Sequence, residues 1–297
     1  MNVAQASVTT ADGLRLAVVE QGPAAAESTP TVLLVHGYPD NSALWTDAAA
    51  RLADRFHVVR YDVRGTGASD QPADRDGYRL DALAADIVAV ADAASPDAPV
   101  HLVGHDWGSI QGWHAITDER YADRFASYTS ISGPCLDHVG YWVRDQFAAR
   151  RFRPVLRQLA HSWYIGFFQL PWLPEQVSRR PELLDRLHAN ARDARNGLEL
   201  YRANMLRRVA GRAPRRTSVP VQQIALSKDN YVLPALLRSA EPWCTRLWRR
   251  ELPYGHWAPR THPVMVADLV AEFIDHLRGG PASLGLQASR VVPTGSR

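Results

Sequence analysis

Short apolar runs alternate with longer amphipathic stretches over the first half of the chain. Residues 7–20 have the pattern of a hairpin that turns at Ala11-Asp12-Gly13, and residues 81–94 have the spacing of a surface helix. Four further runs are short, apolar and rich in β-branched residues, as buried strands are: residues 31–36, 57–61, 100–103 and 125–132. This alternation predicts an α/β protein with a mostly parallel sheet flanked by helices, and a site at the carboxyl ends of the strands.

The strand pattern stops at about Gly133 and returns at about Thr217. Between these positions the chain is helical in its spacing, aromatic and rich in arginine, which predicts an inserted helical lid over residues 134–217. Val219–Ser227 and Leu247–Pro253 then predict two more strands, and a closing amphipathic helix follows them. The predicted core therefore comes from two separate parts of the chain, residues 1–133 and 218–278.

The composition is that of a globular protein with a large core. The chain has 297 residues, 46% of them hydrophobic, and we find no run of about 18 apolar residues that predicts a transmembrane segment. No signal peptide is evident, and the isolated Cys135 and Cys244 fit a reducing cytoplasm. No cluster has the spacing of metal ligands, so we expect neither a metal nor a cofactor. Lys228 is the single lysine, a bias typical of a GC-rich bacterial genome.

Charge is distributed unevenly along the chain. The whole protein carries +3, whereas the segment between Pro134 and Ser218 holds 16 arginines and seven acidic residues. A basic lid could attract an anionic substrate, an acidic carrier protein or a membrane surface. The alternative, which the sequence favours, is that these arginines are solvated and that their stems cover apolar surface. No nucleic-acid motif accompanies the charge, so nucleic acid is not an expected partner, and the oligomeric state has no signal here.

The most informative motif is Gly104-His105-Asp106-Trp107-Gly108, which lies between a predicted strand and a predicted helix. It has the form of a nucleophile elbow, a sharp turn in which glycines avoid clashes between neighbouring Cβ atoms. The central residue, however, is a carboxylate. A carboxylate attacks alkyl carbon and leaves an ester on the protein, whereas amidases and ordinary esterases use Ser or Cys. Asp106 is therefore a candidate nucleophile, with a simple turn-forming role as the alternative.

Two further residues complete a triad in sequence order. Asp229 follows the strand predicted over Val219–Ser227, and His256 lies between the last predicted strand and the helix Pro263–Leu277. The order nucleophile, acid, histidine distinguishes α/β-hydrolases from the other folds that carry such triads. Aspartate is ionised at neutral pH without a base, since its ordinary pKa is about 3.9. His256 is then free to activate water in a second step, with Asp229 orienting its ring.

A loop upstream resembles the oxyanion-hole loop of α/β-hydrolases. It is His36-Gly37-Tyr38-Pro39, and it directly follows the apolar run of residues 31–35. The resemblance implies that backbone N–H groups of Tyr38 and Trp107 stabilise the negative charge that develops on the ester. We assign His36 a structural role in shaping this loop.

These motifs together resemble the epoxide hydrolase branch of the α/β-hydrolase superfamily, over nearly the whole chain from about Ser7 to Leu277. The resemblance implies the α/β-hydrolase fold with its inserted lid, and an enzyme that opens a small-molecule epoxide to a vicinal diol with water. In that family two lid tyrosines hold the epoxide oxygen and protonate it. The matching segments of this chain imply that Tyr164 and Tyr201 have these roles.

The tyrosine pair also separates two chemistries that share an aspartate nucleophile. Opening an epoxide expels an alkoxide, which needs a proton, whereas the halide expelled by a haloalkane dehalogenase needs none. Dehalogenases hold halide with two N–H donors, and Tyr38 stands where an Asn donor could serve. The sequence therefore favours an epoxide hydrolase over a dehalogenase. A catalytically inactive ligand-binding protein is a third alternative, against which the intact triad argues.

The last part of the chain, residues 279–297, is rich in Gly, Pro, Ala and Ser, and we expect a disordered tail that hydrolysis does not need. Within it, Arg290–Gly295 resembles the first strand and glycine turn of a short-chain dehydrogenase, a domain that follows the hydrolase in some bacterial relatives.

Overall fold

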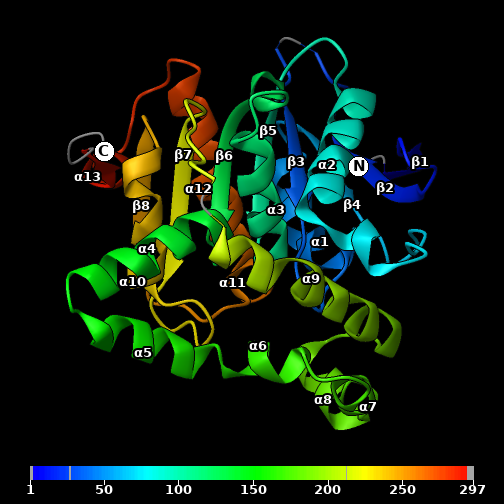
Figure 1. Ribbon diagram of the computed structural model, residues 1–297. Helices are drawn as coiled ribbons and strands as arrows, with labels where there is room; N and C mark the ends of the chain where they lie inside the picture. Colours follow the sequence, from blue (N-terminus) through cyan, green and yellow to red (C-terminus); the bar gives the residue numbers. More distant parts are fainter. Residues whose placement is uncertain (1–2, 27, 212, 293–297) are drawn as a thin grey trace.

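The computed structural model describes residues 3–26, 28–211 and 213–292, and its centre is a single sheet flanked by helices (Figure 1). Over these residues the sheet has nine strands in the order β1-β2-β4-β3-β5-β6-β7-β8-β9. The strands are β1 (Val3–Thr9), β2 (Arg15–Gln21), β3 (Thr31–Val35), β4 (His57–Tyr61), β5 (Val100–His105), β6 (Phe125–Ile131), β7 (Val221–Leu226), β8 (Leu247–Leu252) and β9 (Arg290–Val291). All neighbours from β4 to β8 pair in parallel, and the outer pairs are antiparallel. The predicted mostly parallel sheet is confirmed.

Helices cover both faces of the sheet because successive side chains of each strand point to opposite sides. In the fully buried β3, Val32 and Leu34 pack in one hydrophobic cluster with α1 (Thr46–Leu52) and α12 (Pro263–Leu277). Leu33 and Val35 pack in the other cluster, with α2 (Leu80–Ala94) and α3 (Trp107–Ile116). The short helices of the core are α10 (Pro234–Leu237), α11 (Ala258–Thr261), α13 (Leu284–Ala288) and the 3-10 turns Ser42–Trp45, Arg75–Tyr78, Ala122–Arg124 and Arg238–Trp243.

Among the described residues, six helices lie between β6 and β7 and cross the carboxyl ends of the parallel strands, at the bottom of Figure 1. They occupy the segment for which the sequence predicts a lid, and we keep that name for residues 134–217. The helices are α4 (Leu136–Ala148), α5 (Phe152–His161), α6 (Trp163–Phe168), α7 (Leu173–Val177), α8 (Pro181–Leu187) and α9 (Ala191–Ala210).

α9 is attached to the core by side-chain hydrogen bonds near both of its ends. The Asn204 side chain accepts the N–H of Leu80 at 2.9 Å and donates to the carbonyl of Tyr78 at 2.8 Å. Near the other end of the helix, Asp193 accepts the N–H of Gly67 at 3.0 Å. These buried hydrogen bonds fix the helix against the loops that follow β4, so that its inward side chains have defined positions.

The tail beyond α12 forms secondary structure as far as it is described, and the expectation of disorder is wrong there. It contains α13 and then β9, which pairs with β8 at the edge of the sheet. Leu286 is completely buried against Trp248 and Phe273. This burial stabilises the segment although its composition is that of a loop. Of the segment that resembles a dehydrogenase strand, Arg290 and Val291 form β9, and residues 293–295 lie outside the described residues.

Candidate active site

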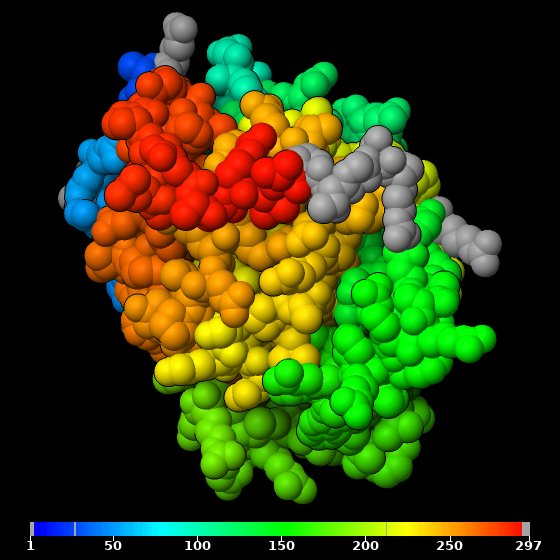
Figure 2. Space-filling view, turned by 90° about the vertical axis from the view of Figure 1, so that its left-hand side faces the viewer, coloured from blue at the N-terminus to red at the C-terminus, as the bar shows by residue number. Residues whose placement is uncertain are grey.

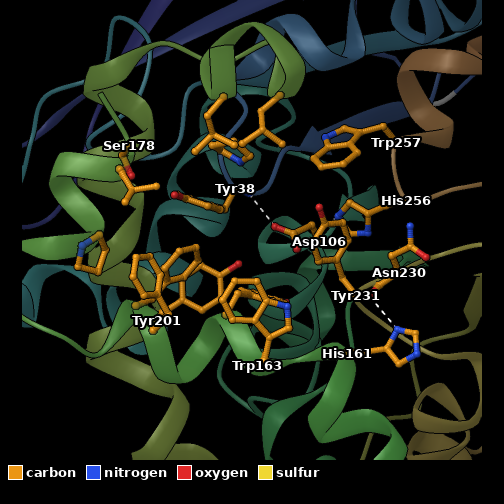
Figure 3. A pocket seen from close by; sticks show the side chains of 18 residues that line it. Tyr38, Asp106, His161, Trp163, Ser178, Tyr201, Asn230, Tyr231, His256 and Trp257 are labelled. Atoms are coloured by element: carbon orange, nitrogen blue, oxygen red, sulfur yellow. Dashed lines mark hydrogen bonds and ion pairs between the residues drawn. The ribbon is translucent and has the colours of Figure 1, made fainter. Parts of the chain in front are cut away.

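Asp106 lies on the turn between β5 and α3, at the carboxyl end of the sheet (Figure 3). Its φ of 53° and ψ of −120° are backbone angles that L-residues rarely adopt. The turn is tight because α3 begins directly against β3, and a Cβ at Gly108 would collide with the backbone of Val35. A Cβ at Gly37 would collide with the Asp106 carboxylate itself. The two glycines therefore allow the carboxylate to lie against the loop that follows β3.

The Asp106 carboxylate is buried and held by backbone donors. The N–H of Tyr38 donates to its Oδ1 at 2.7 Å, and the N–H of Trp107 also forms a hydrogen bond with the carboxylate. Burial raises the pKa of Asp106 to about 6, although the nearby His256 and the two backbone donors act to lower it. The carboxylate is thus mostly ionised at neutral pH, but it is much closer to neutralisation than a solvent-exposed aspartate.

His256 lies between Asp106 and a second buried carboxylate. Its Nδ1–H donates to Asp229 Oδ2 at 2.8 Å, and its Nε2 lies 3.7 Å from Asp106 Oδ2. The other Asp229 oxygen accepts the N–H groups of Tyr231 and Val232, at 2.7 and 3.1 Å. The sequence thus predicts three residues that the loops after β5, β7 and β8 bring together, because parallel strands end at the same edge of a sheet.

The charges of this cluster shift the two partner groups in opposite directions. Burial acts to lower the pKa of His256, but the adjacent charge and hydrogen bond of Asp229, together with Asp106, raise it overall. Burial acts to raise the pKa of Asp229, but His256 and the backbone donors lower it overall. Asp229 is therefore the permanently charged member of the pair, and His256 is the member that takes up and releases a proton.

The two tyrosines expected from the lid face the same carboxylate. Tyr164 on α6 and Tyr201 on α9 both line the cavity that contains Asp106, and their ring centroids are 6.0 Å apart. Tyr201 also contacts the ring of Trp107, at a centroid distance of 4.9 Å. Burial, reinforced by the negative charge of Asp106, raises the pKa of both phenols. Both phenols are thus protonated at neutral pH and can donate hydrogen bonds into the cavity.

Two cavities meet at these side chains. The first, of about 450 Å³, is shown in Figure 3; it includes Tyr38, His256 and the aromatic side chains of α6. The second, of about 310 Å³, is lined mostly by apolar side chains of α3, α4, α5 and α9. The side chains that line both cavities are Asp106, Tyr164, Tyr201 and Tyr231. A molecule that reacts at Asp106 therefore has room for substituents on two sides.

A comparison with known protein families identifies the family of the fold. Residues 30–263 match the family described as the alpha/beta hydrolase fold, which is most of the chain. The chain belongs to this family. The family predicted from the elbow, the triad order and the H-G-x-P loop is thus confirmed.

The relatives of this hydrolase include proteins named for two activities. "Probable oxidoreductase EphD" of Mycobacterium tuberculosis is 36% identical over 308 residues, a match that covers 96% of this chain and 52% of that protein. "Epoxide hydrolase A" of Mycobacterium tuberculosis is 33% identical over 165 residues, or 55% of this chain and 47% of that protein. The chain spans about half the length of these curated relatives. The epoxide hydrolases among them agree with the predicted branch of the superfamily.

Solved structures share the fold of this hydrolase. An epoxide hydrolase of Bacillus megaterium in complex with an inhibitor has a TM-score of 0.74 at 22% identity, covering 92% of this chain and 100% of that chain. An epoxide hydrolase of Vigna radiata has a TM-score of 0.73 at 22% identity, covering 92% and 98%. These similarities confirm the predicted α/β-hydrolase fold.

Sequence analysis of this hydrolase misses Tyr231, which lies two residues after Asp229. Its ring centroid is 4.9 Å from that of His256 and 5.5 Å from that of Tyr164. It therefore forms part of the wall between the catalytic histidine candidate and the lid. Its position two residues after the acid is the one trace of this in the sequence, since nothing in the local spacing marks the ring as facing the cavity.

Two charged or polar residues that hold the His256 loop are also missed. His105 is completely buried, and its Nε2–H donates to the backbone carbonyl of His256 at 2.9 Å. Burial lowers the pKa of His105 to about 3, so its ring is neutral. On the other side of the loop, Asp40 accepts the indole N–H of Trp257 at 3.0 Å and pairs with Arg260. Both residues adjoin motifs found in the sequence, and that adjacency is the signal that could have identified them.

The structure agrees with a structural role for His36. Its Nε2 accepts the N–H of Val63 at 2.9 Å, and its Nδ1–H donates to the carbonyl of Gly37 at 2.9 Å. Both ring nitrogens are therefore occupied in joining two loops. Residues 3–26, 28–211 and 213–292 contain no group of three or more His, Cys, Asp or Glu side chains that could hold a metal ion.

Proposed function

We propose that this protein is an epoxide hydrolase, in which Asp106 forms a covalent ester with the substrate and His256 activates the water that hydrolyses it. The observation that carries the proposal is a buried carboxylate on a strained elbow, with two protonated phenols, Tyr164 and Tyr201, on the same cavity. A nucleophile on one side and proton donors on the other are what the opening of an epoxide requires.

In the first step, a carboxylate oxygen of Asp106 attacks one epoxide carbon, and the bond from that carbon to the ring oxygen breaks. The ring oxygen becomes an alkoxide as it leaves, and Tyr164 or Tyr201 donates a proton to it. Their raised pKa values keep both phenols protonated until this moment. Room on both sides of Asp106 supports a substrate with apolar substituents, because the second cavity is lined mostly by apolar side chains.

In the second step, His256 removes a proton from a water molecule that attacks the carbonyl carbon of the ester. The N–H groups of Tyr38 and Trp107 bind the carboxylate of the free protein, which supports a role for them in stabilising the oxyanion. His256 then gives its proton to the departing alkoxide, which completes the diol. The proton released as Asp106 ionises again restores the phenol, and Asp229 stabilises the charged form of His256 throughout.

Contacts of Trp107 argue against the haloalkane dehalogenase alternative. A dehalogenase needs free N–H donors for the departing halide, whereas the Trp107 side chain has a hydrogen-bonding interaction with Tyr201. The position of a second donor on the H-G-x-P loop is occupied by Tyr38, whose ring packs edge-on against Tyr201 at 5.4 Å. These contacts favour phenol donors at the place where a halide would bind.

The experiment that tests the proposal follows the oxygen atoms. Enzyme in excess over styrene oxide completes one turnover in heavy-oxygen water, and the diol and the peptide that contains Asp106 are analysed by mass spectrometry. We expect ordinary oxygen in the diol and heavy oxygen in Asp106, because the first oxygen transferred comes from the carboxylate. Heavy oxygen in the first-turnover diol would mean direct attack by water, and Asp106 would then act as a base.

A variant provides the independent check. His256→Gln removes the base of the second step, so an adduct with the mass of protein plus substrate should accumulate. The double variant Asp106→Ala/His256→Gln is the matched control and should form no adduct. Release of bromide from a bromoalkane by the parent protein, without diol formation from an epoxide, would instead support the dehalogenase.

A further inference from the structure

The outer edge of the lid exposes an unusual number of apolar side chains. Of the 13 large hydrophobic side chains that are exposed among the described residues, eight lie between residues 147 and 173. They are Phe147, Phe152, Leu156, Leu159, Trp163, Leu170, Trp172 and Leu173. We call the segment of residues 147–173 the apolar rim. In Figure 1 its helices α5 and α6 lie in the lower part of the molecule, below the sheet.

The apolar side chains of α5 form one stripe. Phe152, Leu156 and Leu159 recur at intervals of four and three residues, which places them on one side of α5. Trp163, four residues further on, begins α6. Val155 and Gln158 point inward and are buried, so the stripe is not the face that packs on the core. Leu156 and Trp163 are 62% and 69% exposed. Patches of this kind on a protein surface mark interaction sites, because exposing apolar area to water is unfavourable.

The charged side chains of the same segment are all arginines. Between Gln146 and Pro174 the chain has four arginines and no acidic residue. Arg150, Arg151, Arg153 and Arg157 are exposed and form no ion pair within the described part of the chain. Some arginines elsewhere on the lid are neutralised: Arg202 pairs with Glu175 and Glu199, and Arg208 pairs with Asp81. The exposed apolar stripe is thus flanked by positive charge that no acidic side chain of the described residues neutralises.

From these observations we infer that the apolar rim docks on the surface of an anionic lipid bilayer. A helix with aromatic and leucine side chains on one face and arginines beside them binds the boundary between headgroups and acyl chains. The apolar stripe inserts, while Arg153 and Arg157 pair with anionic headgroups. Docking of two copies of this chain through the rim would bring the arginines of both copies together, which is unfavourable.

The rim lies at the openings of both cavities. Trp163 lines the first cavity and Leu159 lines the second, although both side chains are largely exposed. By contrast, no arginine lines either cavity. The positive charge therefore faces outward and not toward a bound molecule, which argues against an anionic substrate as its partner. A rim docked on lipid would place both openings at the membrane surface, within reach of apolar compounds dissolved there.

The test measures the partition of the full chain onto vesicles by co-sedimentation. Vesicles of phosphatidylcholine are compared with vesicles in which a third of the lipid is phosphatidylglycerol. We expect clear binding to the anionic vesicles, weaker binding to the neutral ones, and a loss of binding as salt is raised. An equal, salt-independent association with both kinds of vesicle, or none, would overturn the proposal.

Two variants locate the surface. Arg153→Gln/Arg157→Gln should weaken binding to anionic vesicles by about 25-fold, at about fivefold for each arginine. Leu156→Gln should weaken it by about tenfold, since a leucine no longer inserts. These side chains are exposed, so the thermal stability of the variants should remain that of the parent protein.

Matched controls use exposed side chains away from the lid. Arg51→Gln/Arg55→Gln removes the same charge at the same spacing near α1, and Leu284→Gln removes an exposed leucine on α13, which Figures 1 and 2 place away from the lid. Both should bind like the parent protein. If the rim variants bind vesicles as tightly as these controls, the rim is not the docking surface. A dimer in solution that Leu156→Gln dissociates would assign the rim to a second copy of the chain.

Discussion

The ionisation of Asp106 leads to a quantitative prediction for the pH dependence of ester formation. Only the carboxylate is nucleophilic, and burial raises the pKa of Asp106 to about 6. A group with this pKa is about nine-tenths ionised at pH 7 and about one-tenth ionised at pH 5. The rate of ester formation should therefore fall about tenfold between these two values. An aspartate with an ordinary pKa would lose less than about a tenth of its rate over the same range.

The assay must measure ester formation separately from its hydrolysis. A rapid-quench experiment with enzyme in excess follows the covalent adduct by intact mass at each pH, and circular dichroism confirms that the protein remains folded. In the variant His256→Gln the adduct persists, so its formation can also be followed by hand mixing. That variant lacks the imidazolium whose charge lowers the pKa of Asp106, so the midpoint of its pH profile should move to higher pH.

Two results would contradict this reasoning. A rate of ester formation that stays constant down to pH 5 would mean that burial does not raise the pKa of Asp106. A midpoint that is the same with and without His256 would mean that the ring does not act on the carboxylate across the 3.7 Å that separate them. Either result would require a different account of how the free protein holds its nucleophile.

Three further predictions concern other parts of the molecule. Tyr164→Phe or Tyr201→Phe should each slow ester formation by about tenfold or more, and the double variant should nearly abolish it. Full activity of the double variant would show that the phenols are not the proton donors. His105→Phe keeps an aromatic ring but loses the hydrogen bond to the carbonyl of His256. Hydrolysis of the ester should therefore slow by about tenfold while its formation is unchanged. Equal slowing of both steps would indicate a general loss of structure. Leu286→Ala should lower the free energy of unfolding by about 3 kcal/mol in denaturant titrations without changing the rate of hydrolysis, whereas the exposed Leu284→Ala should change neither. An unaltered stability of Leu286→Ala would mean that the burial of Leu286 does not stabilise the fold.

Secondary structure was largely encoded in local patterns. The predicted strand His57–Tyr61 and the predicted helix Pro263–Leu277 have the same bounds in the structure. A short run around the β-branched Val58 and Val59 favours a buried strand, and a repeat at helical spacing favours a helix with one buried face. Glycines at the elbow predict the sharp turn for the same local reason. The chain order of Asp106, Asp229 and His256, each after a strand, then predicts that they meet at one edge of the sheet.

Long-range packing determines the structure of the tail and the orientation of Tyr231, which local sequence patterns do not predict. The tail has the composition of a loop, but Leu286 is buried on Trp248 and Phe273, residues that no local pattern connects to it. Tyr231 faces the cavity because loops from β7 and β8 converge with α6, and its neighbours in sequence carry no sign of this.

The charges of the lid also show the difference between what the sequence determines and what the tertiary structure determines. The sequence alone determined that the lid is basic, since net charge is a count of residues. Only the tertiary structure decided which charges are neutralised, because Arg208 meets Asp81 from a distant part of the chain while Arg153 and Arg157 remain unpaired on α5, within the described residues. The pKa of Asp106 is likewise a property of the folded protein, because desolvation depends on everything that surrounds a carboxylate and not on its neighbours in sequence.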